Sequence, residues 1–391
     1  MDIEHNSRKK FYRFPFGAVT CGGEVRLRLA VSGAGIPSAV RLVYMEDGKG
    51  EVRKDMPYIF DVGDHCIYSV NVKMPEKAGL VWYYFELETE RGMVYYGNNS
   101  KQLGGIGEMC FNSPSNSYQI TVYNEDYKTP DWFKTGIAYQ IFVDRFCNGN
   151  ENGEFLGNRT DIIKRNWGEQ PFYKAEQFGG EYKANDFFGG NLKGVIKKLP
   201  YLKDLGISVI YLNPIFKAYS NHKYDTGDYE TIDPMFGDEE TFKELCSKAK
   251  EMGIRIILDG VFNHTGSNSR YFNKYGEYDS VGAYQSKESP YYTWFRFMDW
   301  PDVYESWWGM TTLPQIEEHS EECRKYLLSD KDAIVKRWIK NGASGWRLDV
   351  VDELPGFFVK ELRENVKKAD KDAVIIGEVW EDASNKSAYG E

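Results

Sequence analysis

Residues 345–351 combine an apolar strand pattern with an arginine and a carboxylate. Arg347 and Asp349 are two residues apart, so on a β-strand both side chains point to the same face. Such a pair is either a buried ion pair or part of an active site. The two residues alone leave both interpretations open, and the rest of the chain must decide between them.

Two other predicted strands also lead to an acid. Asp259 follows the apolar segment 254–258, and Glu378 lies just beyond the segment 373–376. In an α/β barrel the carboxyl ends of the strands surround one site, so Asp259, Asp349 and Glu378 would converge there. A single acid at a strand end could cap the next helix, whereas three in register favour an active site.

Converging carboxylates without His or Cys ligands suit two kinds of chemistry. One is metal binding by oxygen ligands, and the other is glycosidic bond cleavage by a pair of carboxyl groups. Arg347 favours the second, because a cation beside Asp349 is expected to hold this carboxylate ionised with a low pKa, as a nucleophile requires. Glu378 precedes Val379 and Trp380. We expect a less charged neighbourhood there, which suits an acid that protonates a leaving group.

The elements that position these acids alternate between strands and helices. Apolar strands separated by helices indicate an α/β fold with a parallel sheet, and no Gly-rich phosphate loop follows the first strand, as an open doubly wound sheet would require. We therefore predict that residues 126–391 form a partial (β/α)8 TIM-type barrel of about five β/α units. A long insertion, 265–320, is a candidate substrate lid or subdomain. The predicted elements are strand 137–143, helix 191–205, strand 207–212, helix 239–252, strand 254–258, helix 323–340, strand 345–350, helix 355–368 and strand 373–376.

The first 125 residues read as an all-β domain. Short alternating segments are separated by Gly, Pro, Asp and Asn clusters, a spacing that indicates a β-sandwich. Its aromatic residues are interpreted as core and cross-strand pairs rather than as a binding platform. The predicted strands are 24–31, 40–45, 67–72, 81–88, 93–96 and 118–122, and the aromatic residues are Trp82, Tyr83, Tyr84, Tyr95 and Tyr96.

Composition narrows the classes of partner. The 391 residues carry a net charge of −10, and the basic residues do not cluster, which argues against nucleic acid and anionic membranes. We find neither a signal-like apolar stretch at the start nor a run of ~18 apolar residues. The six cysteines lack CxxC spacing and suggest reduced thiols in a cytoplasmic protein. Five histidines without a paired motif argue against a His-rich metal hydrolase.

Several motifs together resemble the α-amylase family (glycoside hydrolase family 13), in particular its neopullulanase, cyclomaltodextrinase and amylopullulanase branch. The motifs Asp-Gly-Val-Phe-Asn-His (259–264), Gly-Trp-Arg-Leu-Asp-Val-Val-Asp-Glu (345–353) and Gly-Glu-Val-Trp (377–380) resemble the first three signature regions of that family. Residues 221–229 resemble the segment after its second strand, and residues 1–125 resemble its starch-binding β-sandwich module.

The resemblance implies a retaining glycoside hydrolase acting on maltodextrins, starch, pullulan or cyclodextrins. The α-1,4 bond is the expected target, and α-1,6 cleavage stays open because residues 313–317 depart from the branch's pattern. Asp349 would be the nucleophile and Glu378 the general acid and base, with Arg347 and Asp259 in support. The remaining residues implied are His264 and His222 for sugar hydroxyls, Tyr224 for stacking on the sugar ring, and Trp380 for the acceptor side. Structural roles for the two histidines and for Tyr224 are the alternatives.

Calcium is the one cofactor that the resemblance suggests. Asn148, Asn150, Gly189 and Asn191 match the segments that hold Ca²⁺ in this branch. Asn191 stands where the family usually has Asp, so weaker binding is expected, and an ordinary polar loop is the alternative. A homodimer formed through the N-terminal domain is a further implied partner, and no organic cofactor is expected.

One family feature has no counterpart before Glu391. The fourth signature region, which carries a His-Asp pair near the seventh strand, is not found, so we expect an incomplete barrel that is inactive or nearly so. A non-catalytic α-glucan-binding protein is an alternative, and it would not need Arg347, Asp349 and Glu378 together. An oxygen-ligand Mg²⁺ enzyme would need phosphate-binding features that we do not find.

Overall fold

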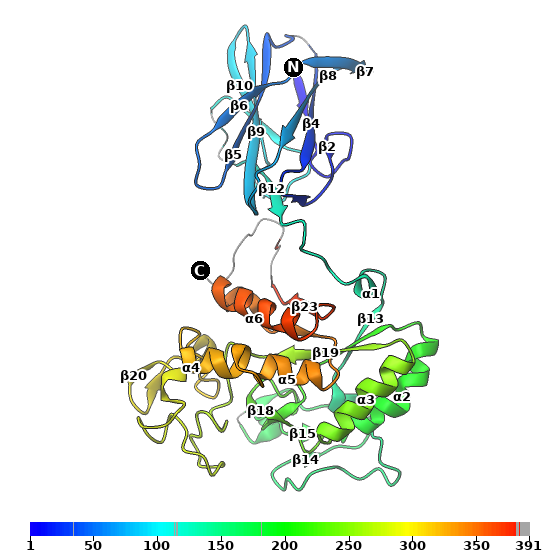
Figure 1. The fold of residues 1–391 in the computed structure, drawn as a ribbon, viewed down its shortest axis with the longest axis vertical. Helices are drawn as coiled ribbons and strands as arrows, with labels where there is room; N and C mark the ends of the chain where they lie inside the picture. The colour runs from blue at the N-terminus through cyan, green and yellow to red at the C-terminus, as the bar shows by residue number, and fades with distance from the viewer. Residues whose placement is uncertain (34, 113, 115, 181, 381–382, 384–391) are drawn as a thin grey trace. The chain divides into compact units, whose positions relative to one another are not determined.

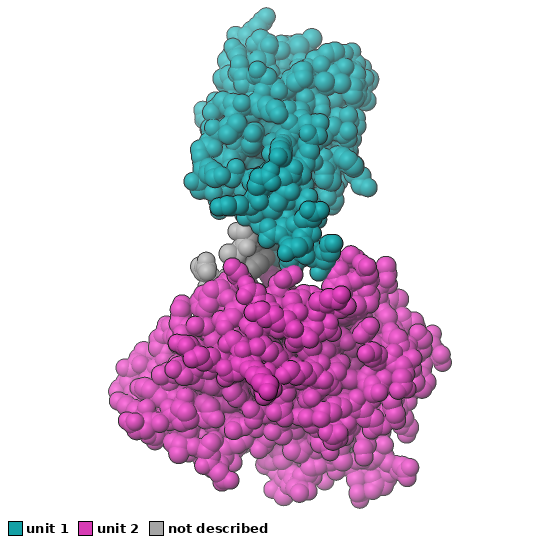
Figure 2. All heavy atoms as spheres, viewed as in Figure 1, with its two compact units in different colours: residues 1–128, 381–387 teal, residues 129–380, 388–391 magenta. Residues whose placement is uncertain are grey.

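The computed structural model describes residues 1–380, except 34, 113, 115 and 181, together with Ala383. Residues 1–128 and 129–380 form two compact units (Figure 2). The division falls between Lys128 and Thr129, close to the boundary that the sequence places at residue 125. Each unit has its own apolar core.

Residues 1–128 fold into a β-sandwich. One sheet has the order β1-β4-β8-β7, with β2 on β4, and the other has the order β11-β10-β9-β12-β3, with β5 on β9 and β6 on β5. Side-chain alternation explains the shared core: Val25, Leu27 and Leu29 of β4 are buried, whereas Arg26 and Arg28 between them are more exposed. The strands are β1 Asp2–Glu4, β2 Arg13–Phe14, β3 Val19–Thr20, β4 Glu24–Ser32, β5 Ala39–Glu46, β6 Val52–Asp55, β7 Tyr58–Val62, β8 His65–Lys73, β9 Gly79–Thr89, β10 Gly92–Gly97, β11 Glu108–Cys110 and β12 Tyr118–Tyr123.

The aromatic residues of this unit lie mainly in its core. Tyr83, Tyr84 and Tyr96 are buried, which confirms the packing interpretation for these three, while Trp82 and Tyr95 are half-buried. The Tyr83 ring stacks on Tyr118 with 5.1 Å between centroids. His5 is fully buried in the same core, where Nδ1 lies 2.8 Å from the Arg28 carbonyl and Nε2 lies 3.0 Å from the Tyr83 hydroxyl.

Residues 129–380 contain a five-stranded parallel sheet, which is the part of an α/β barrel that the sequence predicts. Its order is β13-β16-β19-β22-β23, and every pair along it is parallel. Figure 1 labels β13, β19 and β23 of this sheet. Helices α2 and α3 pack against each other, as do α5 and α6. The strands are β13 Ala138–Ile141, β16 Val209–Leu212, β19 Arg255–Gly260, β22 Gly345–Leu348 and β23 Val374–Gly377; the principal helices are α2 Leu192–Asp204, α3 Glu239–Glu251, α5 Ile334–Lys340 and α6 Gly356–Ala369.

Alternation along these strands separates two faces of the sheet. Ile256, Leu258 and Trp346 point to the large core that the helices cover. Ile257 and Ile376 point to a small apolar cluster on the opposite face. Since strand side chains alternate, Asp259 lies on the same face as Ile257, and Glu378 lies on the same face as Ile376. The apolar cluster therefore forms the floor beneath the acids.

The predicted helix 323–340 is wrong as one element. The chain forms α4 (Glu321–Arg324), a π-helical turn η5 (Lys325–Ser329) and then α5, with an interruption before Ile334. The polar run 329–332 favours non-helical backbone, and the Lys336 ammonium binds the freed carbonyls of Ser329 and Asp330 at 2.6 and 3.0 Å. Across the described ranges, no helix has the length and apolarity needed to span a membrane.

The insertion 265–320 contains little regular structure but packs on the main core. Its buried residues Phe272, Trp294 and Ile316 belong to the same apolar cluster as the strands of the barrel sheet.

The other short elements of residues 129–380 are α1 Asp131–Lys134, η1 Val143–Arg145, β14 Ile163–Lys164, η2 Ala175–Phe178, β15 Asp186–Phe187, β17 Phe216–Ala218, β18 Thr226–Ile232, η3 Tyr292–Trp294, β20 Phe297–Asp299, β21 Val303–Tyr304, η4 Trp307–Gly309 and η6 Val351–Glu353.

Candidate active site

One guanidinium group joins the three acids at the carboxyl edge of the sheet. The register pairs Asp259 of β19 with Arg347 of β22, so these side chains are neighbours on one face. Nη1 of Arg347 lies 2.9 and 3.0 Å from the Asp259 oxygens and 2.7 Å from Oδ1 of Asp349. Nη2 lies 2.6 Å from Oε2 of Glu378. The structure thus brings these four predicted residues together.

The turn after β22, which begins at Asp349, is hydrogen-bonded to Glu378 and so holds the two carboxyl groups near each other. Val350 has a positive φ of 40°, which is strained for a β-branched residue, and its N–H donates to Oε2 of Glu378 at 3.1 Å. A Cβ at Gly377 would lie 2.5 Å from Cγ1 of Val351, so the close approach of β23 to this turn requires glycine. Backbone strain of this kind is concentrated at functional sites.

Burial and charge shift the pKa values of the two aspartates upward. Burial raises the pKa of Asp259 to about 6, although Arg347 and hydrogen bonds from Tyr211 and Tyr224 oppose the shift. Burial and then the negative charge of Asp259 raise the pKa of Asp349 to about 7, against the opposing effect of Arg347. This direction is opposite to the low pKa expected for Asp349, because burial and the charge of Asp259 outweigh the effect of Arg347.

The neighbourhood expected for Glu378 also needs correction. The side chain is half-buried, but it forms an ion pair with Arg347 instead of facing a weakly charged wall. The apolar neighbours in the sequence did not reveal this contact, because it comes from the adjacent strand.

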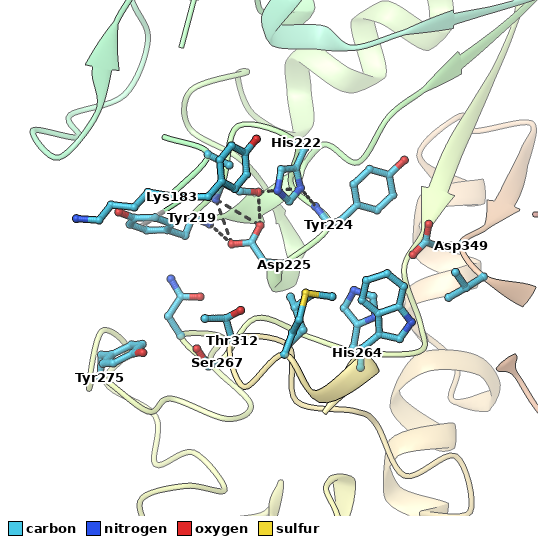
Figure 3. Close-up of a pocket in the computed structure, with 18 of the residues that line it drawn as sticks. Lys183, Tyr219, His222, Tyr224, Asp225, His264, Ser267, Tyr275, Thr312 and Asp349 are labelled. Atoms are coloured by element: carbon cyan, nitrogen blue, oxygen red, sulfur yellow. Dashed lines mark hydrogen bonds between the residues drawn. The ribbon is translucent and has the colours of Figure 1, made fainter. Parts of the chain in front are cut away.

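A cavity of about 960 Å³ opens beside these acids. Arg347, Asp349 and Glu378 line it, together with further predicted residues, namely His222, Tyr224, His264 and Trp380. Figure 3 shows Asp349, Tyr224 and His264 gathered at one end of the view. Asp259 does not line the cavity but contacts two residues that do, Arg347 and Tyr224. The predicted sugar-binding residues therefore share one cavity with the predicted catalytic pair.

The two histidines are neutral hydrogen-bonding groups in this cavity. Nδ1 of His222 accepts the Tyr224 backbone N–H at 3.2 Å, so Nε2 carries the proton. Burial lowers the pKa of His222, and burial lowers the pKa of His264 to about 4. Nε2 of His264 is buried and has no hydrogen-bond partner within the part of the chain that the structure describes. A buried imidazole nitrogen at a cavity wall is suited to bind a hydroxyl of a ligand.

Tyr224 is held by its hydroxyl, which leaves the ring at the cavity wall. The hydroxyl donates to Oδ2 of Asp259 at 3.1 Å, and Tyr211 donates to the same oxygen. The ring of Tyr224 also lies 5.9 Å from the Arg347 guanidinium carbon. Tyr211 was missed in the sequence, because an inward-facing tyrosine inside an apolar strand has no local signal for this contact.

Three tryptophans form an aromatic wall (Trp307, Trp308 and Trp380). His264 stacks on Trp307 with 5.1 Å between centroids, and Trp308 lies 5.2 Å from Trp380. Glu353 fixes the wall, since its carboxylate accepts Nε1–H of Trp307 at 2.8 Å and of Trp308 at 2.9 Å. Trp380 was expected at the site, whereas the role of Glu353 was missed.

The four candidate calcium ligands lie together, but away from the cavity. Oδ1 of Asn148 accepts the Asn150 backbone N–H at 2.8 Å and Nδ2–H of Asn191 at 3.2 Å. Oδ1 of Asn191 accepts from Gly149 at 3.1 Å and, as the N-cap of α2, from Gly194 at 2.9 Å. The described residues contain no cluster of three His, Cys, Asp or Glu that could hold a metal.

These residues do not fit Ca²⁺ in this arrangement. Calcium prefers charged and unengaged oxygens, and here the oxygens of Asn148 and Asn191 already accept N–H groups. The predicted calcium site stays a prediction.

Fold and site together define a β-sandwich joined to an α/β barrel sheet with an acidic carboxyl edge. The model of the alpha amylase catalytic domain matches residues 140–391. The chain belongs to the α-amylase family, which confirms the resemblance seen in the motifs.

Relatives and solved structures agree with this assignment. The chain is 39% identical over 413 residues to an amylopullulanase of Thermoanaerobacterium saccharolyticum, a match that covers 98% of this chain and 32% of the relative. It is 41% identical over 266 residues to a cyclomaltodextrinase of Thermoanaerobacter pseudethanolicus, covering 65% of this chain and 41% of the relative.

A solved cyclomaltodextrinase aligns with a TM-score of 0.61 and 27% identity, covering 97% of this chain and 61% of that one. The type III pullulan hydrolase from Thermococcus kodakarensis aligns with a TM-score of 0.58 and 29% identity, covering 97% and 62%. These likenesses confirm the predicted fold class. The chain thus spans about a third of the length of the amylopullulanase and under two thirds of these solved chains.

Proposed function

We propose that the protein is a retaining glycoside hydrolase that cleaves α-1,4-glucosidic bonds. The observation that carries this proposal is the contact of one Arg347 guanidinium with Asp259, Asp349 and Glu378 at the rim of a large cavity. A pair of carboxyl groups beside a sugar-sized cavity is the arrangement that glycosidic bond cleavage requires. The relatives bear the names amylopullulanase, cyclomaltodextrinase and neopullulanase, which supports maltodextrins, cyclodextrins and pullulan as substrates.

The proposed reaction uses the two outer carboxyl groups in sequence. Ionised Asp349 attacks the anomeric carbon while protonated Glu378 gives its proton to the glycosidic oxygen, so the carbon–oxygen bond to the leaving sugar breaks. Glu378, now ionised, takes a proton from water as that water attacks the same carbon and releases Asp349. Two inversions give a product with the original anomeric configuration.

Supporting groups stabilise the cation-like sugar and hold it in place. Tyr224 offers its ring to the sugar face, and Nε2 of His222 and Nε2 of His264 bind hydroxyls. Arg347 keeps Asp349 oriented, and Asp259 anchors Arg347 from below. The aromatic wall around Trp380 receives the leaving sugar. Cleavage of α-1,6 bonds belongs to the same proposal, because amylopullulanases are among the relatives.

The test is turnover of maltodextrin by a parent protein that carries the fourth signature region in addition to these 391 residues, and by its Asp349→Asn and Glu378→Gln variants. We expect reducing sugar to appear with this parent only, with the α-anomer formed first in proton NMR, and we expect the 391 residues alone to release little or none. First formation of the β-anomer would contradict a retaining mechanism. Binding of maltodextrin without turnover by the parent, unchanged in both variants, would instead identify a non-catalytic glucan-binding protein. Digestion of pullulan separates the bond preferences, since panose, isopanose and maltotriose arise from different cleavages.

A further inference from the structure

A separate cavity opens in the β-sandwich and is lined by two arginines, Arg8 and Arg13. Its volume is about 290 Å³, and none of its described lining residues is an aspartate or a glutamate. Nη2 of Arg8 donates to the Leu103 carbonyl at 2.7 Å, which holds this exposed side chain at the cavity. Small-molecule sites usually span ~300–1,000 Å³, so this cavity suits a compact ligand. Two guanidinium groups without an acid in the lining indicate that such a ligand is an anion.

Strand pairing directs the Arg13 side chain into the sandwich. Where β2 pairs with β4, Arg13 lies opposite Leu27, which belongs to the apolar core between the sheets. Opposite residues share a face, so the guanidinium group points inward. Its Nη1 donates at 2.9 Å to the carbonyl of Gln119, which lies on β12 in the other sheet (Figure 1). Its Nη2 donates at 2.6 Å to the Gly17 carbonyl, and only 7% of Arg13 is exposed.

No carboxylate compensates this buried charge. Among the residues that the structure describes, no acid lies within 4.0 Å of the guanidinium group of Arg13 or Arg8. The titratable neighbours of Arg13 are neutral, because burial lowers the pKa of His5 to about 3 and raises the pKa of Tyr83 to about 12. Nε of Arg13 is buried without a hydrogen-bond partner within residues 1–128 as described. Buried charges are normally paired, so the structure leaves a counter-charge to be supplied from outside.

Two hydroxyl groups add hydrogen-bond donors to the same cavity. Oγ of Ser7, a residue only 5% exposed, accepts the Gly105 N–H at 2.9 Å. Oγ1 of Thr121 accepts from the Gln119 amide at 3.1 Å. A hydroxyl group that accepts in this way can still donate its own proton. Guanidinium and hydroxyl donors without competing carboxylates are what an oxyanion requires.

We propose that Arg8 and Arg13 form a binding site for a phosphate group, carried either by free phosphate or by a small phosphorylated metabolite. A phosphate monoester has about −1.5 to −2 charges at pH 7, so it balances two guanidinium groups, whereas a carboxylate balances one. The planar guanidinium also matches the geometry of phosphate oxygens. A bound phosphate supplies the counter-charge that Arg13 lacks and thereby stabilises the β-sandwich. The site needs none of the acids at the barrel sheet and is independent of the proposed function.

Isothermal titration calorimetry of the full chain with inorganic phosphate tests the site. The ionic strength is held constant with NaCl, because salt screens exposed charges. We expect one phosphate to bind per chain, and we expect acetate to bind at least about tenfold more weakly because it carries a single charge. Glucose 6-phosphate separates the two sources: tighter binding than phosphate identifies a phosphorylated metabolite, and weaker binding identifies free phosphate.

Arg8→Gln is the decisive variant, because Arg8 is exposed and its replacement should leave the fold intact. We expect its affinity for phosphate to fall at least about fivefold, as for the loss of one hydrogen bond between charged groups. Arg91→Gln is the matched control, since it removes the same charge from an exposed residue between β9 and β10, outside this cavity. Its affinity should equal that of the parent. Arg13→Gln should abolish binding, and a thermal scan checks that this variant folds.

Three results would overturn the proposal. They are no binding of phosphate to the parent, equal affinity for phosphate and acetate, and equal affinity for phosphate in the parent and Arg8→Gln. If Arg13→Gln does not fold, the comparison of Arg8→Gln with Arg91→Gln still decides. No readout involves catalysis, so failure of this site leaves the proposed function standing.

Discussion

Nη2 of Arg347 lies 2.6 Å from Oε2 of Glu378, so the cation of one strand binds the acid that follows the next strand. The same guanidinium binds Asp259 and Asp349 through Nη1. Its single positive charge is shared among three carboxylates, and it lowers the pKa of Asp349 less than burial and the negative charge of Asp259 raise it. Contact with three carboxylates through two nitrogens depends on the planar guanidinium of arginine.

Arg347→Lys should remove most of the activity while keeping the positive charge. A lysine ammonium is a compact point charge that cannot contact three carboxylates from two directions, so Asp349 and Glu378 would lose their relative placement. We expect kcat/KM on maltodextrin to fall by about 100-fold or more. Steady-state kinetics measures this effect.

Arg270→Lys is the matched control for this substitution. Arg270 is half-buried and pairs with Asp228 and Glu230, and it does not line the cavity beside the acids. We expect this variant to keep kcat/KM within about threefold of the parent, as for a substitution remote from the site. An Arg347→Lys variant as active as Arg270→Lys would contradict the shared-guanidinium account.

The acidic limb of the pH profile should move when Asp259 loses its charge. Asp349 must be ionised to act as a nucleophile, and a pKa of about 7 means that kcat/KM decreases as the pH falls below that value. After burial, the negative charge of Asp259 is the next cause of this raised pKa. Asp259→Asn removes that charge, so the pKa of Asp349 should decrease and the acidic limb should move to lower pH.

The measurement is kcat/KM from pH 4 to 9 for the parent and for Asp259→Asn. The position of the limb, not the height of the profile, is the readout, because the substitution also weakens the anchor of Arg347. A limb that stays in place or moves to higher pH would show that burial alone sets the pKa of Asp349.

Calcium removal should leave the stability of the protein unchanged. The amide oxygens of Asn148 and Asn191 already accept N–H groups, so little affinity for Ca²⁺ is expected. In thermal scans with excess chelator or with millimolar CaCl2 we expect Tm values within about 1 °C of each other, since only a bound ion shifts the equilibrium.

Asn191→Asp makes the calcium measurement informative. The carboxylate keeps the helix cap and adds the charge that the family usually has at this position, so Tm should rise with CaCl2 in this variant. A calcium-dependent Tm in the parent protein would show that Ca²⁺ displaces the amide network.

The β-sandwich should lose stability in acid through His5. Burial is the main cause that lowers the pKa of His5 from 6.5 to about 3. Because the folded state binds the proton less readily than the unfolded state, the contribution of the neutral ring is complete above pH 6.5 and is lost as the pH falls toward 3. Between these limits, protonation of His5 alone should lower the free energy of unfolding by about 1.4 kcal/mol for each unit by which the pH falls.

His5→Gln separates this contribution from that of the carboxylates. Glutamine keeps hydrogen-bonding groups for the Arg28 carbonyl and the Tyr83 hydroxyl but does not titrate. Urea unfolding followed between pH 4 and 7 should give a shallower pH dependence for this variant. Parallel curves for the variant and the parent would mean that His5 is not neutral in the folded state.

The sequence predicted the elements whose periodicity is strong. The parallel strands and the helices α2, α3 and α6 match their predicted positions, because apolar side chains recur with the period of each element. Convergence of Asp259, Asp349 and Glu378 also followed from the sequence, since strand alternation and a parallel sheet place them at one edge. The break before α5 was missed, because a short polar run does not outweigh the apolar pattern on either side.

Contacts between distant side chains could not be predicted. The ion pair of Arg347 with Glu378 depends on the rotamers of two residues on different strands. Tyr219, Asn268 and Glu277 likewise line one cavity, although Tyr219 lies on a different loop from the other two. Local sequence carries no signal for such contacts, whose geometry is decided by how loops of different strands pack.

The two indole contacts of Glu353 bear on how this protein could be re-engineered. Trp307 and Trp308 belong to the insertion 265–320, whereas Glu353 belongs to the turn after β22. The insertion is therefore not a self-contained module. A chimera that transplants residues 265–320 into another barrel must carry Glu353 with it, or the grafted tryptophans will lack the acceptor that sets their orientation.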